Sequence, residues 1–498
     1  MNIKEAKEEI VHTVRAYTAK DDFGNYEIGV THQRPILLIG PPGIGKTAIM
    51  EQVARECGIG LVAYTITHHT RQSAIGLPII EHKDFGGVNY PVTEYTMSEI
   101  IGSVYNQMEQ TGFKEGILFI DEINCVSETL APTMLQFLQG KTFGNHKVPE
   151  GWIIVAAGNP PEYNKSVKEF DIVTLDRVKR IDVTENLAVW KEYAYKEGIH
   201  GSIISYLDIK KENFYTIETT VEGKRFVTAR GWEDLSQMIK VYQKLGIPVT
   251  EGVIRQYLQH PVIAKEFSAY LDLYEKYASD YNVEEILKGS VNPGAAERMA
   301  SAPFDEKLSV IGLLVSRLSD GACDCFEWDS YVERLFGVLK FVKGEPVLIE
   351  GLEAVLENEK AKWAKNQNGK ALDKVDARVS RRMLDTLEEY LKDARGGADF
   401  DVIRDKFNQN VAKRQNLLST WKSGFDNSFH FIEAAFWESQ EMVVFITELN
   451  TSHYALWFIG ENGCDKYYQY NQGLLLGERQ RSIMADIQGI EKELSFLG

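Results

Sequence analysis

A glycine-rich segment, GPPGIGKT at residues 40–47, combines residue types that bind phosphate. It fits the pattern G-x-x-x-x-G-K-[ST] and stands between an apolar run and a helical pattern. Glycines let successive N–H groups turn inward, and a helix N-terminus adds partial positive charge. We expect Lys46 to contact the β and γ phosphates of a nucleotide and Thr47 to bind Mg²⁺. The residues expected to bind the nucleotide here are Gly40, Pro41, Pro42, Gly43, Ile44, Gly45, Lys46 and Thr47.

Two acids, Asp121 and Glu122, end another apolar run in the segment ILFIDEIN. A cation on phosphates needs a carboxylate ligand, which Asp121 would supply through water. Glu122 would polarise the water that attacks the γ phosphate. Two acids at the end of a strand are often merely solvated, but the phosphate loop in the same chain favours the catalytic interpretation.

A neutral amide, Asn159, follows a third apolar run in the segment AGNPPEYN. A plain turn is the simplest interpretation of Gly158 to Pro161. Ligands of open α/β sheets, however, bind at the carboxyl ends of the strands. We therefore expect Asn159 to hydrogen-bond the attacking water without adding charge.

The elements that must position these residues alternate along the first part of the chain. Strand-length apolar segments without period-two alternation occur at residues 35–39, 61–66, 116–120, 152–157 and 180–183. Helical patterns occur at residues 2–20, 47–57 and 128–139, the last with Ser127 or Thr129 as its N-cap. This alternation predicts an α/β domain with a parallel sheet in three layers over residues 1–185.

The rest of the chain has mainly helical patterns. Residues 186–287 contain helical candidates at 187–197, 232–245, 253–258 and 263–277, interrupted by a polar stretch at 210–224. Small residues, glycine and proline cluster at 288–303, where we place a boundary. Residues 288–498 are expected to form a mainly α-helical C-terminal domain.

In order along the chain, six segments resemble motifs of the AAA+ ATPases, and among them of the MoxR-like group. They are GPPGIGKT, TITHHTRQSAIGLP, ILFIDEIN, VAAGNPPEYN, LDRVKR and TARGWEDL, between about residues 30 and 240. The resemblance implies the AAA+ three-layer core of P-loop NTPases, followed by a helical lid at residues 186–287. It also implies that Asn159 is sensor one, that Arg177 is the arginine finger, and that Arg230 is sensor two on the lid. The sequence LDRVKR leaves Arg180 as the alternative arginine finger.

The resemblance further implies an activity and partners. MoxR-like proteins hydrolyse Mg-ATP, typically as hexameric rings in which each arginine finger completes the site of a neighbouring subunit. They act like chaperones on partner protein complexes, often with proteins that carry von Willebrand factor A domains. Residues 68–91 are similar to the insertion that marks this group, and are a candidate for contacting targets.

Composition narrows the remaining alternatives. The formal net charge is −17, which disfavours a nucleic-acid partner. The five cysteines are scattered, and no signal peptide or membrane-spanning run is present, so a cytoplasmic location is expected. Two alternative functions stay open: a nucleic-acid-directed NTPase motor or GTP-dependent restriction subunit, and a slowly hydrolysing, nucleotide-gated scaffold.

Overall fold

The computed structural model describes most of the 498 residues as two compact units. The described residues are 1–68, 71–127, 129–143, 145–163, 170–220, 223–290, 293–368, 372–437 and 439–472. The first unit comprises Met1–Val189, Thr228–Arg230 and Glu357–Ala377. The second comprises Trp190–Val227, Gly231–Leu356 and the chain from Arg378 onward.

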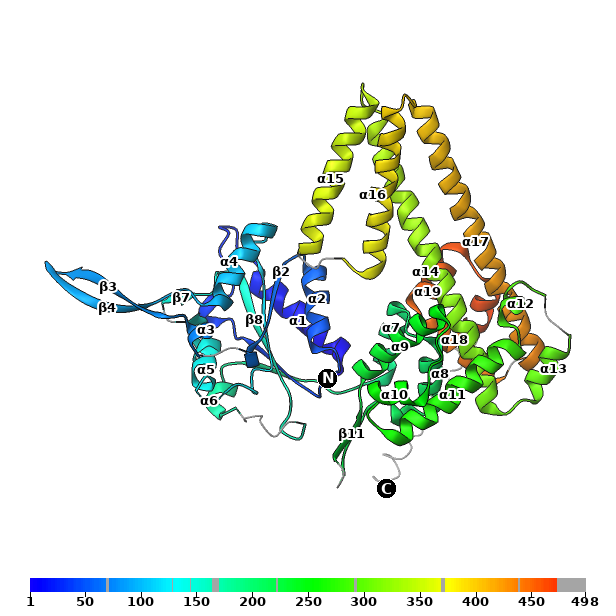
Figure 1. Cartoon of the computed structure of the whole chain (residues 1–498), viewed down its shortest axis with the longest axis horizontal. Helices are drawn as coiled ribbons and strands as arrows, with labels where there is room; N and C mark the ends of the chain where they lie inside the picture. The colour runs from blue at the N-terminus through cyan, green and yellow to red at the C-terminus, as the bar shows by residue number, and fades with distance from the viewer. Residues whose placement is uncertain are drawn as a thin grey trace, which may run out of the picture. The chain divides into compact units, whose positions relative to one another are not determined.

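A five-stranded sheet forms the centre of the first unit (Figure 1). In spatial order its strands are β2 (Gly60–Thr65), β5 (Gly116–Asp121), β8 (Trp152–Gly158), β1 (Ile36–Ile39) and β9 (Lys179–Asp182). Every neighbouring pair is parallel. Each of the five apolar segments forms one of these strands, so the predicted parallel sheet is confirmed.

Helices cover both faces of this sheet. α1 (Ile3–Thr18) and α2 (Lys46–Cys57) pack on one face, and α4 (Glu99–Thr111) and α5 (Ala131–Gly140) pack on the other. Successive residues of β5 alternate between the two cores, with Phe119 on the α1–α2 side and Leu118 on the α4–α5 side. Strands buried on both faces explain why the sequence shows continuous apolar runs, and the three-layer prediction is confirmed.

The start of α5 differs from our prediction. We expected a helix over residues 128–139 with Ser127 or Thr129 as its cap, but α5 begins later, so that Pro132 is its second residue. Proline lacks an N–H group and fits the first turn of a helix but not its interior, which excludes the earlier start. The helix also includes Gly140, which we expected to stop it. Glu128 lies outside the described residues.

The insertion between β2 and α4 forms a hairpin. Residues 68–91 contain α3 (Arg71–Ile75) and most of the antiparallel pair β3 (Pro78–Phe85) and β4 (Val88–Tyr95). Figure 1 shows this hairpin extending from the first unit. Residues 69 and 70 of the insertion lie outside the described part. The remaining short elements of this unit are η1 (Val30–His32), η2 (Ile66–His68), β6 (Thr142–Phe143), β7 (His146–Lys147) and α6 (Ile172–Leu175).

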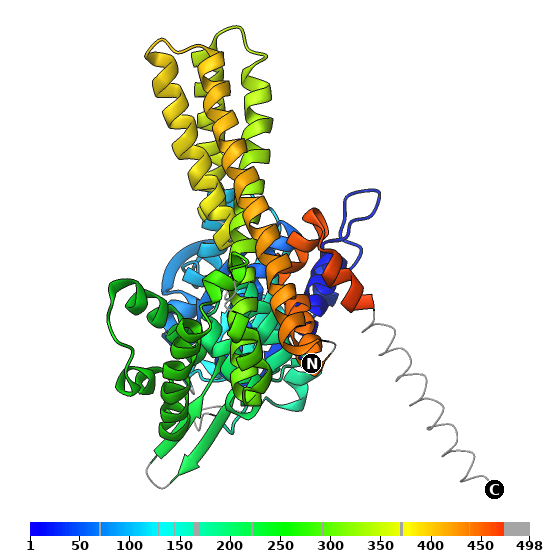
Figure 2. The same ribbon diagram turned by 90° about the vertical axis from the view of Figure 1, so that its right-hand side faces the viewer.

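Residues 186–287, which we predicted to form a lid and call the lid region, follow the predicted helical pattern. Its helices are α7 (Leu187–Glu197), α8 (Gly201–Ile209), α9 (Ala229–Leu245), α10 (Glu251–Tyr257), α11 (Pro261–Asp280) and α12 (Val283–Leu287). The polar stretch at 210–224 begins with η3 (Lys211–Asn213) and continues into an unpredicted hairpin of β10 (Thr216–Thr220) and β11 (Gly223–Val227). Figure 2 shows this hairpin projecting from the helices of the second unit.

The C-terminal region is mainly helical, as predicted. Its helices are α13 (Pro293–Ser301), α14 (Phe304–Val342), α15 (Leu348–Asn368), α16 (Lys374–Arg395), α17 (Phe400–Phe436), α18 (Gln440–Thr451) and α19 (His453–Asn462). α14 and α17 have 39 and 37 residues and run beside each other (Figures 1 and 2). No helix among the described residues is long and apolar enough to cross a membrane.

The compact units do not follow the predicted boundary near residue 288. That position lies inside the second unit, which joins the lid region to most of the C-terminal helices. Just before the stretch where we placed the boundary, Leu287 accepts a hydrogen bond from Asn427 at 2.9 Å, and the stretch itself contains α13. The three-part division into residues 1–185, 186–287 and 288–498 stays a prediction.

Candidate active site

The glycine-rich loop joins β1 to α2. Gly43 and Gly45 have φ angles of 74° and 95°, in the left-handed region that favours glycine, and α2 begins directly after Gly45. A Cβ atom on Gly40 would lie 2.7 Å from the carbonyl oxygen of Val183, so the start of the loop has no room for a side chain. The loop therefore has the conformation and the adjoining helix N-terminus that phosphate binding requires.

Lys46 lies buried at the centre of this loop. Its Nζ donates to the carbonyl oxygens of Gly40 and Pro41, each at 2.8 Å, and to Oδ1 of Asn159 at 3.0 Å. Burial lowers the pKa of the Lys46 ammonium to about 8, although the nearby Asp121 carboxylate opposes this shift. The side chain thus carries its charge at neutral pH in a place largely removed from water.

Thr47 and Asp121 bring two oxygen ligands together. Thr47 Oγ1 donates to Oδ2 of Asp121 at 2.8 Å, while the other carboxylate oxygen accepts from the N–H of Glu122 at 2.9 Å. A hydroxyl and a carboxylate beside a phosphate loop are the hard oxygen donors that Mg²⁺ prefers. The donor set therefore fits the predicted magnesium site.

Glu122 is held in an unusual backbone conformation. Its φ is 58°, which is uncommon for a residue other than glycine, and the turn is closed by a 2.9 Å hydrogen bond from the N–H of Cys125 to its carbonyl oxygen. Oε2 of Glu122 accepts a hydrogen bond from the Thr67 hydroxyl at 3.1 Å. The side chain of the expected base is therefore oriented by a residue that follows β2.

Asn159 is fixed by the side chain of Asn124. The Asn124 amide donates from Nδ2 to the carbonyl oxygen of Asn159 at 2.8 Å and accepts from its N–H at 3.2 Å. These two hydrogen bonds resemble one additional residue pair in the hydrogen-bond pattern that joins β5 to β8. A Cβ atom on Gly158 would lie 2.6 Å from Oδ1 of Asn124, so the close approach depends on glycine.

The predicted arginines differ in what they contact. The backbone N–H of Arg230, at the start of α9, donates to the carbonyl oxygen of Gly43 at 3.2 Å, which places this residue beside the phosphate loop. Arg177 is exposed and donates to Gln139. Arg180 is also exposed and pairs with Asp182 of its own strand at 2.8 Å.

The structure thus brings together most of the predicted site residues. Lys46, Thr47, Asp121, Glu122 and Asn159 meet at the carboxyl edge of the sheet, with the start of α9 beside the loop. Within the described part of the chain, no recorded hydrogen bond or ion pair joins either candidate finger, Arg177 or Arg180, to this group.

Sequence reasoning missed two residues of the site, Thr67 and Asn124. Both follow strands of the same parallel sheet, whose carboxyl ends meet at one edge. We predicted Asn159 from the rule that ligands of open α/β sheets bind at the carboxyl ends of the strands. The same rule covers polar residues just after any other strand. Applied to every strand, it would have singled out both.

The burial of Lys46 predicts a pH dependence of nucleotide affinity. Contact with phosphate favours the charged form of Lys46. The free protein has this form below about pH 8, whereas above that pH Lys46 must take up a proton when the nucleotide binds. The affinity for Mg-ATP should be constant below that pH and fall by up to about tenfold per pH unit above it. Titration with a fluorescent ATP analogue from pH 7 to pH 9.5 measures this. Lys46→Arg, which stays charged, should show no such fall; a flat wild-type profile would contradict the prediction.

The amide clamp predicts a positioning role for Asn124 that acts through Asn159. Asn124→Ala should lower kcat by roughly 10-fold to 100-fold and change KM little, because the phosphate loop is untouched. Combined with Asn159→Ala, it should cause no further loss, since residues that act as a unit are non-additive. Steady-state kinetics of the single and double variants, with melting temperatures as the control for folding, provide the test. Losses that multiply would show that Asn124 acts independently.

Two comparisons with known proteins give a match to this chain. The model of the AAA family, ATPases associated with various cellular activities, matches residues 36–177. A stretch of 57 residues is 42% identical to the ATP-dependent zinc metalloprotease FtsH 1 of Sphaerobacter thermophilus. That stretch is 11% of this chain and 8% of the relative, so the chain matches only a short part of the relative's length. The family match covers β1, β2, β5 and β8, the phosphate loop and the acid pair, and it ends before β9 begins. Residues 36–177 are therefore an ATPase domain of the AAA family.

Proposed function

We propose that this protein is a MoxR-like AAA+ ATPase that works as a hexameric ring in the cytoplasm and uses Mg-ATP hydrolysis to remodel or mature a partner protein complex. The observation that carries this proposal is the convergence of Lys46, Thr47, Asp121, Glu122 and Asn159 at one edge of the sheet. In that arrangement every group needed to hold a triphosphate and activate water lies within one domain.

The geometry supports a division of labour among these residues. Lys46 exchanges its contacts with Gly40, Pro41 and Asn159 for phosphate oxygens, which makes the Asn159 amide available to orient water. Thr47 and Asp121 would hold Mg²⁺, which would supply positive charge to offset that of the phosphates. Glu122, steadied by Thr67, takes the proton of the attacking water.

An exposed surface around Arg177 supports the ring. Arg177 follows α6, where Ile172 and Val173 are 84% and 55% exposed. A cation next to exposed apolar side chains suits an interface in which one subunit presents Arg177 to the nucleotide of the next. Such a head-to-tail interface gives a closed ring or an open filament, and we propose the ring.

The β3–β4 hairpin supports contact with a protein client. Ile80, Phe85, Val88 and Tyr90 are half or more exposed on it, and a two-stranded hairpin alone cannot bury both of its faces. We propose that this hairpin contacts the client, and that von Willebrand factor A domain proteins are candidate partners, as in the group that the sequence resembles.

The catalytic assignment is tested with Glu122→Gln. This change preserves the size of the side chain and the phosphate loop, so affinity for ATP should stay within about threefold of wild type while turnover falls by at least about 100-fold. Nucleotide titration and phosphate release measure the two quantities. The variant, held with ATP, should also retain a protein client in an affinity pulldown. Unchanged turnover would refute the role of Glu122, and recovery of DNA or RNA in place of protein would refute the proposed client class.

The arginine finger is tested by mixing subunits. The Arg177→Ala variant should bind ATP but lose turnover. Its phosphate loop and acid pair are intact, but no neighbouring subunit supplies an arginine finger to them. Lys46→Ala should also be inactive, but it still carries Arg177. Mixing the two should restore part of the activity, since each mixed interface can pair an intact loop with an intact finger. Arg180→Ala, which removes an ion pair within one strand, is the control and should stay active. Activity lost in Arg180→Ala and kept in Arg177→Ala would reverse the assignment.

A further inference from the structure

Two glycines allow a lid helix and a C-terminal helix to touch closely. Gly201 of α8 and Gly312 of α14 lie on opposite sides of residue 288 in the sequence. A Cβ atom on Gly201 would lie 2.6 Å from Oγ of Ser316, and one on Gly312 would lie 2.8 Å from Oγ of Ser205. Each helix thus presents a glycine where the other presents a serine, and neither position has room for a larger residue.

A tyrosine reinforces this contact. The hydroxyl of Tyr270, on α11, donates to Oγ of Ser205 at 2.7 Å and shares a 3.0 Å hydrogen bond with Oγ of Ser309. Ser205 belongs to the lid region and Ser309 to α14. One side chain therefore bonds to elements from both sides of the predicted boundary.

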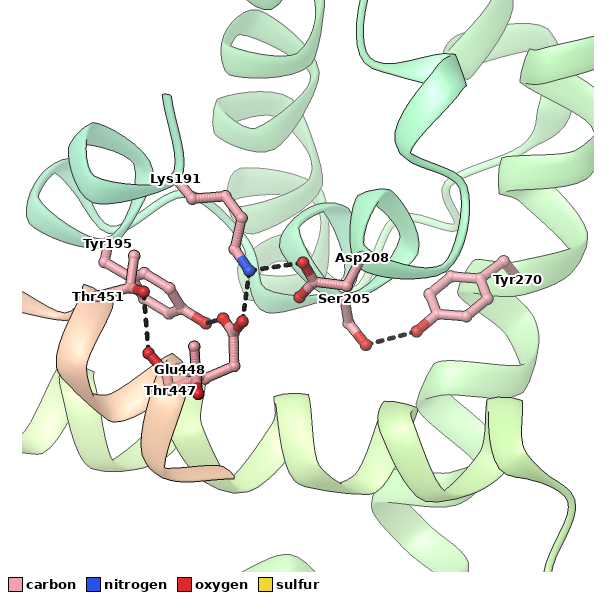
Figure 3. Close-up of polar contacts among 8 residues, drawn as sticks. All are labelled: Lys191, Tyr195, Ser205, Asp208, Tyr270, Thr447, Glu448 and Thr451. Atoms are coloured by element: carbon pink, nitrogen blue, oxygen red, sulfur yellow. Dashed lines mark hydrogen bonds and ion pairs between the residues drawn. The ribbon is translucent and has the colours of Figure 1, made fainter. Parts of the chain in front are cut away.

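A buried charge cluster joins the lid region to α18 (Figure 3). Lys191 Nζ, from α7, lies 2.5 Å from Oδ1 of Asp208 and 2.6 Å from Oε1 of Glu448, and the Tyr195 hydroxyl donates to Oε2 of Glu448 at 2.8 Å. Only 9% of the Lys191 side chain and 12% of the Glu448 side chain are exposed. Because an unpaired charge is strongly disfavoured in such surroundings, separating α18 from α7 is energetically difficult.

Helix α9 links the phosphate loop to this body. The N–H of Arg230 bonds to Gly43 in the loop, while Trp232, two residues later, is fully buried in the second unit. Trp232 donates from Nε1 to the carbonyl oxygen of Phe214 at 3.1 Å and packs edge-on against Phe267, with ring centroids 5.2 Å apart. One helix therefore begins at the phosphate loop and continues into the core of the second unit.

We propose that the lid region and the helices α14, α17 and α18 move as one rigid body, so that the C-terminal helices are the arm through which nucleotide-dependent motion reaches the client. This proposal rests on the proposed ATPase cycle and assigns a role to a region whose function the sequence motifs do not predict. Since a helix rises about 1.5 Å per residue, the 39 residues of α14 span roughly 58 Å, and a rotation of a few degrees at one end moves the other end by several ångströms.

Parts of α15 and α16 belong to the first compact unit. Residues 357–377, the end of α15 and the start of α16, belong to that unit, where Arg55 donates to the carbonyl oxygen of Leu372 at 3.1 Å. The Lys365 ammonium lies 5.3 Å from the centre of the Phe113 ring. These contacts belong to the first unit, so the end of α15 and the start of α16 are not part of the proposed rigid body.

Distance measurements between three spin labels test the proposal. The spin labels are attached to ketone-bearing residues that replace Gln110 in the core, Lys244 in the lid and Ala412 on α17. Because the labels react with ketones, the five native cysteines are not labelled. With Mg²⁺ and a non-hydrolysable ATP analogue, the 110–244 and 110–412 distances should shift while the 244–412 distance stays the same. A nucleotide-dependent shift of the 244–412 distance, or an unchanged 110–412 distance, would overturn the proposal. Binding of the analogue is measured separately, so a failure to bind nucleotide would instead refute the proposed function.

The charge cluster is tested in the same labelled protein. Glu448→Ala should broaden the 244–412 distance distribution at least about twofold, because α18 loses its tie to α7. Glu448→Gln, which keeps the shape of the side chain, covers the case in which the alanine variant fails to fold, and should broaden the distribution in the same direction. Glu353→Ala removes an exposed ion pair with Arg395 and is the matched control, with no broadening expected. Equal distributions in the Glu448→Gln and Glu353→Ala proteins would contradict the role of the cluster.

Discussion

The burial of one cation, the ammonium of Lys46, is the constraint on which the active site depends. A charge removed from water must be compensated, and here two loop carbonyls and the Asn159 amide provide the compensation. These partners also fix where the loop and the end of β8 lie relative to each other. Phosphate oxygens would compensate the same charge better than neutral carbonyls, so the site favours a polyanionic ligand.

The parallel sheet explains why the other groups are close by. Strands β2, β5, β8 and β1 all end at one edge, and each is followed by a polar residue of the site: Thr67, Asp121 with Glu122, Asn159 and the phosphate loop. Backbone strain at Glu122 is tolerated because the residues around it hold the turn in place. The same packing that buries the apolar runs therefore sets the positions of the catalytic side chains.

Much of this could be predicted from the sequence, and the failures have physical causes. Apolar runs and local motifs are encoded in neighbouring residues, so the five strands, the phosphate loop and the acid pair were predictable. The clamp between Asn124 and Asn159 depends on the register of two strands, which local patterns do not reveal. The close contact of α8 with α14 joins residues more than one hundred positions apart, and the local pattern of small residues at 288–303 does not reveal it.

A determined structure of the protein with Mg²⁺ and a non-hydrolysable ATP analogue would test the central claim most directly. Lys46 Nζ should then lie within about 3 Å of β and γ phosphate oxygens, having left the carbonyls of Gly40 and Pro41, with the metal beside Thr47. A nucleotide bound elsewhere, or a Lys46 that keeps its present partners while the nucleotide is bound, would contradict this account.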